Sequence, residues 1–355
     1  MKHRPYRLFI LAIAATILLS AVAAYHPAQA ENAPLPDRAS QLSGHAACAG
    51  VSYETPSTPE CDALMASRPT PNVTPLPVDF GIVADEQFIR FNKNNVSVYD
   101  APNGNLVETL VTGYTYFTPS KIEDGWAQIR PDRWVSLEDA RFASPSTFSG
   151  VTINGGLDMP FAWVLWRHYP TRTPNGVNNR DVGLVQRYQL VNIYATVNVS
   201  GWNWHLIGPN QWVNQKNLSI VYPSAPAEFG GRWLAVNLFE QNIVGYEGGA
   251  PVVATLVSSG LKNGKWDTHE GTFTIGTRLE AAPMTGAEGQ ADYYSLDKVP
   301  YAQYFDGLIS LHGTYWHDSF GYPHSHGCVN LTISDAKYLF AWVAEGTTVY
   351  VYSGL

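Results

Sequence analysis

Four histidines and one cysteine fall within seventeen residues near the carboxyl end of the 355-residue chain: His312, His317, His324, His326 and Cys328. A thiol attacks a carbonyl only as the thiolate, so a nucleophilic cysteine needs a nearby imidazole to take its proton. That imidazole needs an acceptor on its second nitrogen to fix its tautomer. Gly327 suits this chemistry, because glycine lets backbone N–H groups come close to an oxyanion. Spacing alone does not select the histidine that faces the sulfur.

Two other interpretations of this cluster stay open at this point. Zinc binds histidine nitrogen and cysteine sulfur, but the spacing lacks the H-E-x-x-H or paired C-x-x-C pattern and offers one thiolate. Alternatively, Cys328 is a buried structural thiol and the histidines are ordinary polar residues. The density of His and Gly around the cysteine favours the nucleophile. His317 and His324 are expected to be hydrogen-bonded loop residues.

The start of the chain predicts export. Lys2, Arg4 and Arg7 precede an apolar run, and Ala28-Gln29-Ala30 supplies an A-x-A cleavage site, so residues 1–30 are expected to be a signal peptide. No later stretch is long and apolar enough to span a bilayer. The mature protein is therefore expected to be secreted to the cell envelope or cell wall, with no membrane span.

The three cysteines can be sorted by this expected location. In an oxidising compartment, an odd count suggests one disulfide and one free thiol. Cys48 and Cys61 are close in sequence and are the natural pair, which leaves Cys328 as the free thiol.

Composition limits the fold and the partners. Apolar residues make up 45% of the chain and charged residues 15%, which indicates a globular protein. Removing the signal takes away three of the 22 basic residues and none of the 30 acidic ones, so the net charge moves from -8 to -11 (19 minus 30). A surface this acidic disfavours nucleic acid as a partner.

A repeat divides the middle of the chain. Gly125-Trp126 is followed by Trp134, and Gly201-Trp202 is followed by Trp212, with alternating β-type runs before each. The pattern resembles a tandem of bacterial SH3-like modules, which implies two small β-barrels that bind cell-wall polymer. The tryptophans could equally be core residues of those barrels.

The last unit begins with alternating segments and contains one helical pattern. Ala336, Leu339, Phe340 and Val343 recur at helical spacing, with Thr332 or Ser334 as the cap and Gly346 as the stop. The fold class is thus mainly β: two small SH3-like β-barrels, then a β-rich catalytic domain with one main helix. The expected segments are a signal peptide (1–30), a Pro/Ser/Thr-rich spacer holding the possible Cys48–Cys61 disulfide (31–78), two SH3-like domains (79–145 and 150–222) and a catalytic domain (231–355).

The motifs of this last unit resemble those of a known family. Ser325-His326-Gly327-Cys328-Val329-Asn330, preceded by His312-Gly313, is similar to the H…[S/T]-H-G-C-x-N signature of L,D-transpeptidases with a YkuD-type catalytic domain. Thr268–Phe273 resembles the family's T-P-x-G-x-F turn, with His269 in place of Pro. Met284-Thr285-Gly286, Tyr293-Tyr294 and Val299-Pro300 resemble its lid and substrate groove. The resemblance covers about residues 233–355.

The resemblance assigns roles to individual positions. Cys328 matches the acyl-accepting thiol, His312 the general base, and the Gly313 carbonyl the group that orients it. The N–H groups of Gly327 and Cys328 match the oxyanion hole. The remaining matches are pocket and groove positions: Ser325, His326, Asn330, Met284 and Tyr294.

The implied function is transfer of peptidoglycan stem peptides through a cysteine thioester, giving 3→3 cross-links, or trimmed stems when water is the acceptor. The resemblance implies no metal and no organic cofactor. A non-catalytic cell-wall binding protein and a zinc-dependent peptidase are the alternatives.

Overall fold

We describe the fold from a computed structural model, which describes residues 44–354 except 53, 56 and 82–86. The predicted signal peptide (1–30) lies outside these residues. The described chain is built mainly of strands, with two α-helices, α2 (Pro59–Ser67) and α4 (Ile333–Trp342), and short 3-10 helices. The prediction of a mainly β protein is therefore confirmed. Neither helix of the described part is long and apolar enough to cross a membrane.

The carboxy-terminal domain is built on two sheets. The first has the strand order β1-β10-β19-β18-β17-β25-β20. Its strands are β1 (Val73–Pro75), β10 (Val151–Ile153), β17 (Arg232–Asn237), β18 (Asn242–Glu247), β19 (Ala250–Leu256), β20 (Gly271–Thr274) and β25 (Thr348–Tyr352). β17, β18 and β19 form an antiparallel meander, and β25 pairs with β17 in parallel.

Two strands of this sheet come from earlier in the chain. β10 pairs with β19, and β1 pairs with β10, so both extend the sheet beyond the meander. β10 therefore belongs to the carboxy-terminal sheet, although its residues fall in the range expected for the second SH3-like domain. Val151 is buried in that sheet and Ile153 beside it, which covers an edge strand that would otherwise be open.

The second sheet carries the residues expected to do chemistry. Its order is β24-β23-β22-β5-β2-β9, and β21 pairs with β22 on the side. The strands are β2 (Ile89–Phe91), β5 (Tyr114–Phe117), β9 (Ala140–Phe142), β21 (Arg278–Gly286), β22 (Tyr294–Asp306), β23 (Ile309–Gly313) and β24 (Val329–Leu331). One apolar core joins this sheet to the first through residues such as Val236, Leu311 and Val349.

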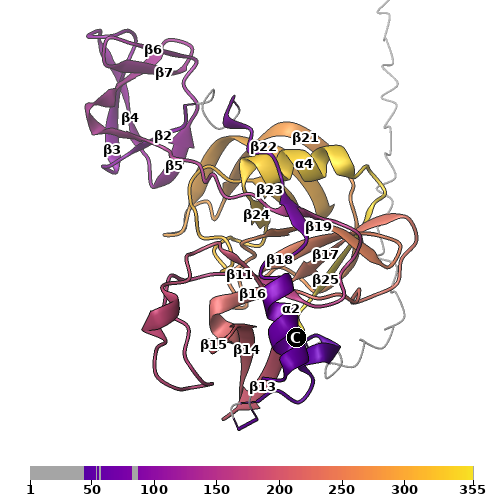
Figure 1. Ribbon diagram of the computed structural model, residues 1–355. Helices are drawn as coiled ribbons and strands as arrows, with labels where there is room; N and C mark the ends of the chain where they lie inside the picture. Colours follow the sequence, from indigo (N-terminus) through magenta and orange to yellow (C-terminus); the bar gives the residue numbers. More distant parts are fainter. Residues whose placement is uncertain (1–43, 53, 56, 82–86, 355) are drawn as a thin grey trace, which may run out of the picture.

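Helix α4 packs on β22 and β23 (Figure 1). The Thr332 side chain accepts the Asp335 N–H at its start, and Ala336 and Leu339 face the core, so the predicted helix is confirmed. It ends with Val343 as the C-cap rather than continuing to Gly346.

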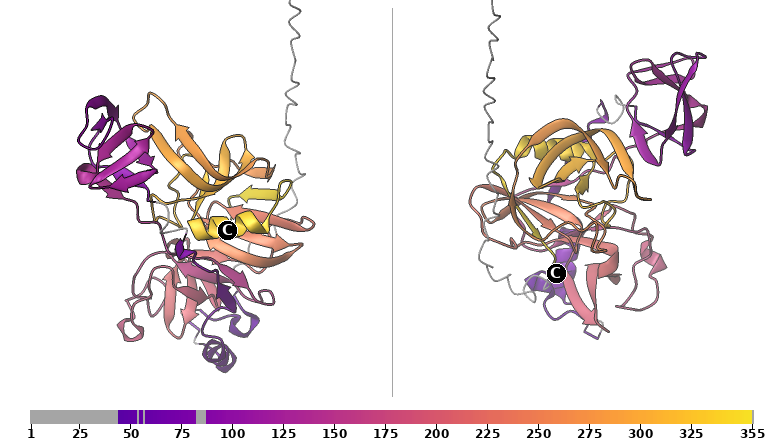
Figure 2. Two further views of the ribbon diagram at one scale, coloured as in Figure 1. Left: turned by 90° about the horizontal axis from the view of Figure 1, so that it is seen from above. Right: turned by 180° about the vertical axis from the view of Figure 1, so that it is seen from behind.

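The first β unit (β2 to β9) projects from one side of the molecule, close to β22 (Figures 1 and 2). Its own sheet has the order β4-β3-β8-β7-β6. These strands are β3 (Asn95–Tyr99), β4 (Leu106–Val111), β6 (Lys121–Glu123), β7 (Trp126–Arg130) and β8 (Arg133–Ser136), with η2 (Leu137–Asp139) following. β2, β5 and β9 pair among themselves and with β22 instead of closing onto this sheet, and no closed barrel is found in the described residues.

The second β unit (β11 to β16) packs against the opposite end of the carboxy-terminal domain. It has two three-stranded sheets, β12-β11-β16 and β13-β14-β15. Its strands are β11 (Phe161–Val164), β12 (Leu190–Asn192), β13 (Ala195–Val199), β14 (Trp202–Gly208), β15 (Gln211–Asn214) and β16 (Leu218–Val221), with η3 (Arg180–Val182) and η4 (Gln215–Asn217) in the loops. Of the repeat tryptophans, Trp134 and Trp212 are buried, whereas Trp202 is exposed.

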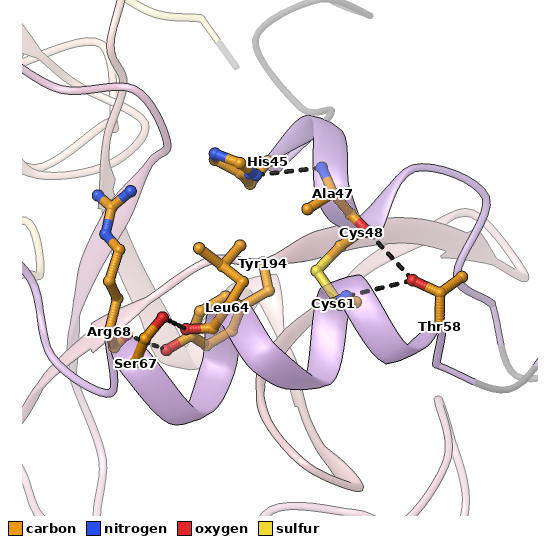
Figure 3. Close-up of a disulfide and its surroundings, with 9 residues drawn as sticks. All are labelled: His45, Ala47, Cys48, Thr58, Cys61, Leu64, Ser67, Arg68 and Tyr194. Carbon is orange, nitrogen blue, oxygen red and sulfur yellow. Dashed lines mark hydrogen bonds between the residues drawn. A yellow bond between two sulfur atoms is a disulfide. The ribbon is translucent and has the colours of Figure 1, made fainter.

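The segment expected to be an extended spacer is folded from residue 44 onward. A disulfide joins Cys48, at the end of η1 (Ala46–Cys48), to Cys61 in α2 (Figure 3). Thr58 caps α2 by accepting the Cys61 N–H at 3.2 Å. The disulfide and Met65 pack against buried side chains of the second β unit, Tyr194, Leu206 and Trp212 among them. The capped helix and the cross-link give this Pro-rich segment a small core that its composition does not suggest.

Candidate active site

Two neighbouring strands bring the predicted nucleophile and base together. β23 pairs in parallel with β24, in a register that places His312 opposite Asn330, and Cys328 immediately precedes β24. Cys328 and His312 both open into one cleft of about 480 Å³. Other predicted site residues that line it are Met284, Tyr294, Ser325, His326 and Asn330. Gly313 and Gly327 are not among the residues that line it.

Cys328 is a partly exposed free thiol. Its Sγ lies 3.8 Å from the Ser310 hydroxyl and 3.8 Å from the Leu308 carbonyl oxygen. Burial raises the pKa of the thiol above its ordinary value, and the Ser310 hydrogen bonds oppose that shift in part. The resting residue is therefore a thiol rather than a thiolate.

Ser310 is a site residue that the sequence motifs do not indicate. It is fully buried on β23 and points to the same side of the strand as His312, two residues later. That spacing was the available signal, because alternate residues of a strand share a face.

His312 is buried and oriented by its neighbour. Its Nδ1 lies 3.0 Å from the carbonyl oxygen of Gly313, the position to which the family resemblance assigns this role. Desolvation lowers the pKa of His312 to about 4, although the Gly313 bond favours the charged form. The ring is thus neutral near pH 7, with its proton on Nδ1 and a lone pair on Nε2. Between the two described side chains of Cys328 and His312 there is no direct hydrogen bond.

The turn before Cys328 is held by hydroxyl groups. The Ser325 hydroxyl donates to the Cys328 carbonyl oxygen and accepts the Gly327 N–H at 3.1 Å. The Thr268 hydroxyl donates to the Gly327 carbonyl oxygen at 2.7 Å. Gly327 has a φ of +115°, a conformation that side chains disfavour. Because its N–H is already bonded to Ser325, Gly327 is not a free oxyanion donor in this structure.

His326 lies between two aromatic rings. Its ring centroid is 4.4 Å from that of Trp266 and 5.0 Å from that of Tyr294. Burial lowers the pKa of His326 and raises the pKa of Tyr294 to about 12, so both are neutral at pH 7. They form an apolar wall of the cleft rather than a source of charge.

Asn330 is fixed by a histidine outside the family signature. Its side-chain amide lies 2.9 Å from Nε2 of His317, whose Nδ1 accepts the Ser319 N–H at 3.0 Å. A neutral ring that accepts at Nδ1 carries its proton on Nε2. We therefore assign the Asn330 amide the orientation that turns its otherwise unbonded Oδ1, in place of Nδ2, toward His317. Desolvation, then His324 and His312, lowers the pKa of His317 to about 3. His317 is thus a hydrogen-bonded loop residue, whereas His324 lines the cleft.

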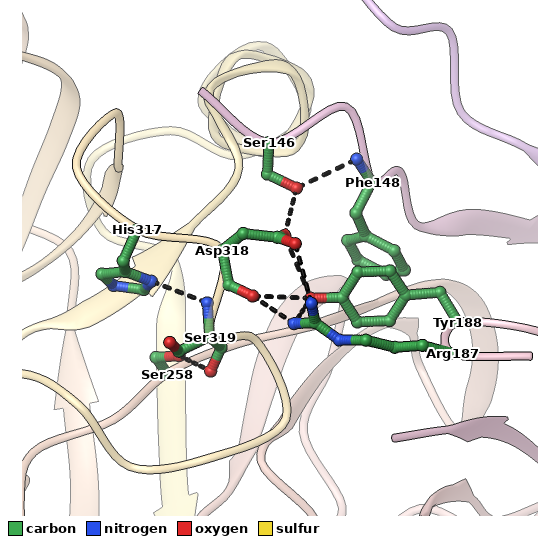
Figure 4. Close-up of polar contacts among 8 residues, drawn as sticks. All are labelled: Ser146, Phe148, Arg187, Tyr188, Ser258, His317, Asp318 and Ser319. Carbon is green, nitrogen blue, oxygen red and sulfur yellow. Dashed lines mark hydrogen bonds and ion pairs between the residues drawn. The ribbon is translucent and has the colours of Figure 1, made fainter. Parts of the chain in front are cut away.

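The loop between β23 and Cys328 is anchored from outside its own domain (Figure 4). The Asp318 carboxylate accepts the Ser146 hydroxyl at 2.5 Å, the Tyr188 hydroxyl at 3.1 Å and the Arg187 guanidinium at 2.8 Å. Ser146 precedes β10, and Arg187 and Tyr188 belong to the second β unit. The second β unit therefore holds the loop that carries His317.

The described residues were compared with the zinc site that the histidine cluster could form. Within the described ranges, no group of three or more His, Cys, Asp or Glu side chains is placed to hold a metal ion.

Fold and site together define a β-rich domain in which a neutral histidine on β23 and a cysteine just before β24 line one cleft. Residues 231–351 match the family model of the L,D-transpeptidase catalytic domain, known as YkuD. Over these residues the sequence is therefore similar to L,D-transpeptidase catalytic domains of the YkuD type.

Individual proteins are also similar to part of this chain. A Bacillus subtilis protein, YciB, whose name assigns it provisionally to the L,D-transpeptidases, is 30% identical over 130 residues, 34% of this chain and 64% of its own. An L,D-transpeptidase structure from Stackebrandtia nassauensis is 28% identical, with 36% of this chain and 58% of that chain covered and a TM-score of 0.29. One from Xylanimonas cellulosilytica is 25% identical, with 37% and 64% covered and a TM-score of 0.31. The chain thus spans less than two thirds of the length of each of these relatives.

Proposed function

We propose that this protein is an exported cysteine L,D-transpeptidase that acts on peptidoglycan stem peptides. One observation carries the proposal: a free thiol, Cys328, and a neutral, oriented imidazole, His312, face one cleft in a domain that matches the transpeptidase family. Neutral partners suit a mechanism in which the base takes the proton as the thiol attacks.

The first half of the reaction would form a thioester. The thiol of Cys328 turns from Ser310 toward Nε2 of His312 and gives up its proton as the sulfur attacks the carbonyl between the third stem residue and the terminal D-Ala. The C–N bond then breaks, and the imidazolium returns the proton to the departing amine of D-Ala. The acyl group remains on the sulfur.

The second half would release the acyl group. An amine of another stem attacks the thioester, His312 takes a proton from that amine, and the C–S bond breaks as the thiolate recovers a proton. The product is a 3→3 cross-link. Water in place of the amine would give a trimmed stem.

The two β units would serve binding rather than chemistry. We propose that they act as SH3-like modules that hold the catalytic domain against cell-wall polymer, which raises the effective concentration of stems. The predicted signal peptide supports this location, because the substrate lies outside the cytoplasm.

The direct test is incubation of the mature protein with defined disaccharide tetrapeptides, followed by mass identification of the products. A dimer joined between the third residues, formed with release of D-Ala, is expected, and it should be absent with Cys328→Ala. Binding to peptidoglycan without any product from the wild type would contradict the proposal and favour a non-catalytic wall-binding protein.

A further inference from the structure

One wall of the catalytic cleft comes from outside the catalytic domain. Strand β5 of the first β unit pairs in parallel with β22, placing Tyr114 opposite Tyr294 and Tyr116 opposite Leu296. As a result Arg90, Asn94, Gly113 and Tyr114 line the same cleft as Cys328. The match to the transpeptidase family begins at residue 231 and does not include this wall.

Stacked aromatic rings form the contact between the first β unit and the catalytic domain. Phe88 stacks on Tyr315 at a ring-centroid distance of 3.5 Å and an interplanar angle of 7°, and Tyr116 meets Tyr315 edge-on at 5.6 Å. The Tyr315 hydroxyl donates to the Asp297 carbonyl oxygen at 2.6 Å, and the Thr118 N–H donates to the Asp297 carboxylate at 3.2 Å. Tyr315 is fully buried and lies three residues after His312. This contact places the wall in a fixed position relative to the base.

Arg90 is the basic side chain of this wall. Its guanidinium carbon lies 4.8 Å from the ring centroid of Tyr114 and 5.9 Å from that of Tyr116, which holds it by cation–π contact. Across the part of the chain that the structure describes, Arg90 makes no ion pair and no side-chain hydrogen bond. The one carboxylate of the cleft, Asp292, is already bound by Lys265 at 2.9 Å and by the Trp266 N–H at 3.0 Å.

A half-buried guanidinium without an acidic partner is suited to bind a carboxylate from outside the chain, because its donors match the two oxygens in a bidentate fork. We propose that Arg90 of the first β unit binds a carboxylate of the peptide substrate and so sets substrate specificity. The inference rests on the proposed function. The carboxylate is either that of the terminal D-Ala or a side-chain carboxylate on the third stem residue.

The test measures binding separately from turnover. Tetrapeptide affinity is measured by calorimetry on Cys328→Ala protein, with and without Arg90→Gln. Loss of the guanidinium is expected to raise Kd about 10- to 100-fold for a peptide carrying both carboxylates. Arg90→Lys keeps the positive charge and the contact with the tyrosine rings, so its affinity for the peptide is expected to fall less. It also serves as a second variant if Arg90→Gln disturbs the fold.

Two peptide arms identify the carboxylate. One peptide is amidated at its C-terminus, and the other lacks the carboxylate on its third residue. One of the two peptides should bind Cys328→Ala weakly and show no further change in Kd with Arg90→Gln. That peptide lacks the carboxylate that Arg90 binds.

Arg141 provides the matched control. It lies opposite Arg90 on the paired strand β9, is exposed and does not line the catalytic cleft, so Arg141→Gln should leave Kd unchanged. Three results would overturn the inference: no peptide binding to Cys328→Ala, equal affinity with and without Arg90, or an equal loss for a peptide with no carboxylate. Peptide binding that depends on Arg90, without product from the wild type, would uphold this inference and reject only the proposed transpeptidase activity.

Discussion

Cys328 and His312 form a neutral pair in the resting site. Burial moves their pKa values apart, raising that of the thiol and lowering that of the imidazole to about 4. The pair therefore holds a single transferable proton over a wide pH range, because neither group titrates near neutrality. Activity should require that the thiol of Cys328 carries its proton and that Nε2 of His312 is free to accept it.

The first prediction concerns the pH dependence of acylation. The value of kcat/KM should be flat near neutrality and fall in acid near pH 4, where His312 becomes protonated and can no longer accept the thiol proton. Stopped-flow acylation by a tetrapeptide measures this, with circular dichroism at each pH to show that the fold persists. An acid limb near pH 6.5 would mean that His312 titrates as an exposed imidazole.

Residues differ in how far the sequence predicts their roles. The density of His and Gly around Cys328 indicated the nucleophile, but only the family resemblance selected His312 as its base. Ser310 could be found only from its two-residue spacing from His312 on one strand. Arg90 could not be found, because it reaches the cleft only through the pairing of distant strands, β2 with β5 and β5 with β22. The role given to the Gly327 N–H also depends on a local bond, to Ser325, that no sequence pattern displays.

At the scale of elements, the loop before Cys328 is held by contacts with residues outside the catalytic domain. Asp318 ties it to Ser146 and to the second β unit, and Ser319 passes that constraint to His317 and Asn330. A single exposed ion pair contributes little, but Asp318 combines one with two hydroxyl donors.

Asp318→Ala should loosen this loop. We expect amides of residues 314–327 to exchange with deuterium roughly 10-fold faster, and kcat/KM to fall about 3- to 10-fold while the global melting temperature changes little. Asp181→Ala breaks a similar ion pair, with Arg172, in the second β unit away from the cleft and should leave both quantities unchanged. Wild-type exchange rates in Asp318→Ala would show that the anchor has no mechanical role.

The disulfide-bearing segment is a second element with a testable role. The Cys48–Cys61 disulfide joins residues 13 positions apart in the sequence. A disulfide of this kind contributes about 2–4 kcal/mol to the free energy of unfolding. Replacing both cysteines by alanine should lower the unfolding free energy of the second β unit by that amount. The rate of acylation at Cys328 should be unchanged at 25 °C. Denaturant unfolding measures the loss of stability, and an acylation assay on the same variant measures the rate. An unchanged unfolding transition would contradict this account.

At the scale of the whole molecule, local elements follow from the sequence and their assembly does not. The α4 helix and the strands β17 and β19 are predicted by the periodicity of their own residues. That β1 and β10 extend the carboxy-terminal sheet, and that β5 joins β22, depends on pairings between distant segments, which alternation within each strand cannot specify. The same pairings place β1, β2, β5, β9 and β10 in the two sheets of the carboxy-terminal domain.

The junction between the second β unit and the catalytic domain contains a buried acid. Glu240 accepts the Ile220 N–H at 2.7 Å and the Tyr222 hydroxyl at 2.8 Å. Burial raises the pKa of Glu240 to about 7, although these hydrogen bonds oppose the shift. The folded protein therefore holds this proton more tightly than the unfolded chain does.

Stability should consequently fall as pH rises. Below the ordinary carboxyl pKa both states are protonated, and the contribution of Glu240 is lost as pH increases from about 4.5 through about 7. Glu240→Gln should remove this dependence and stabilise the fold at pH 8 by on the order of 1–3 kcal/mol. Glu247→Gln, which alters an exposed carboxylate paired with Arg232, is the control. Equal pH profiles for Glu240→Gln and wild type, measured by thermal melting, would contradict the assignment.

Acylation of Cys328 is tested most directly by the intact mass of the protein after brief incubation with a tetrapeptide substrate. We expect a covalent adduct equal to the acyl tripeptide, located on Cys328 by peptide mapping, and no adduct with Cys328→Ala. We also expect His312→Gln to slow adduct formation at least 100-fold near pH 7. An adduct that persists in Cys328→Ala, or a wild-type protein that remains unmodified while the substrate is consumed, would contradict this mechanism.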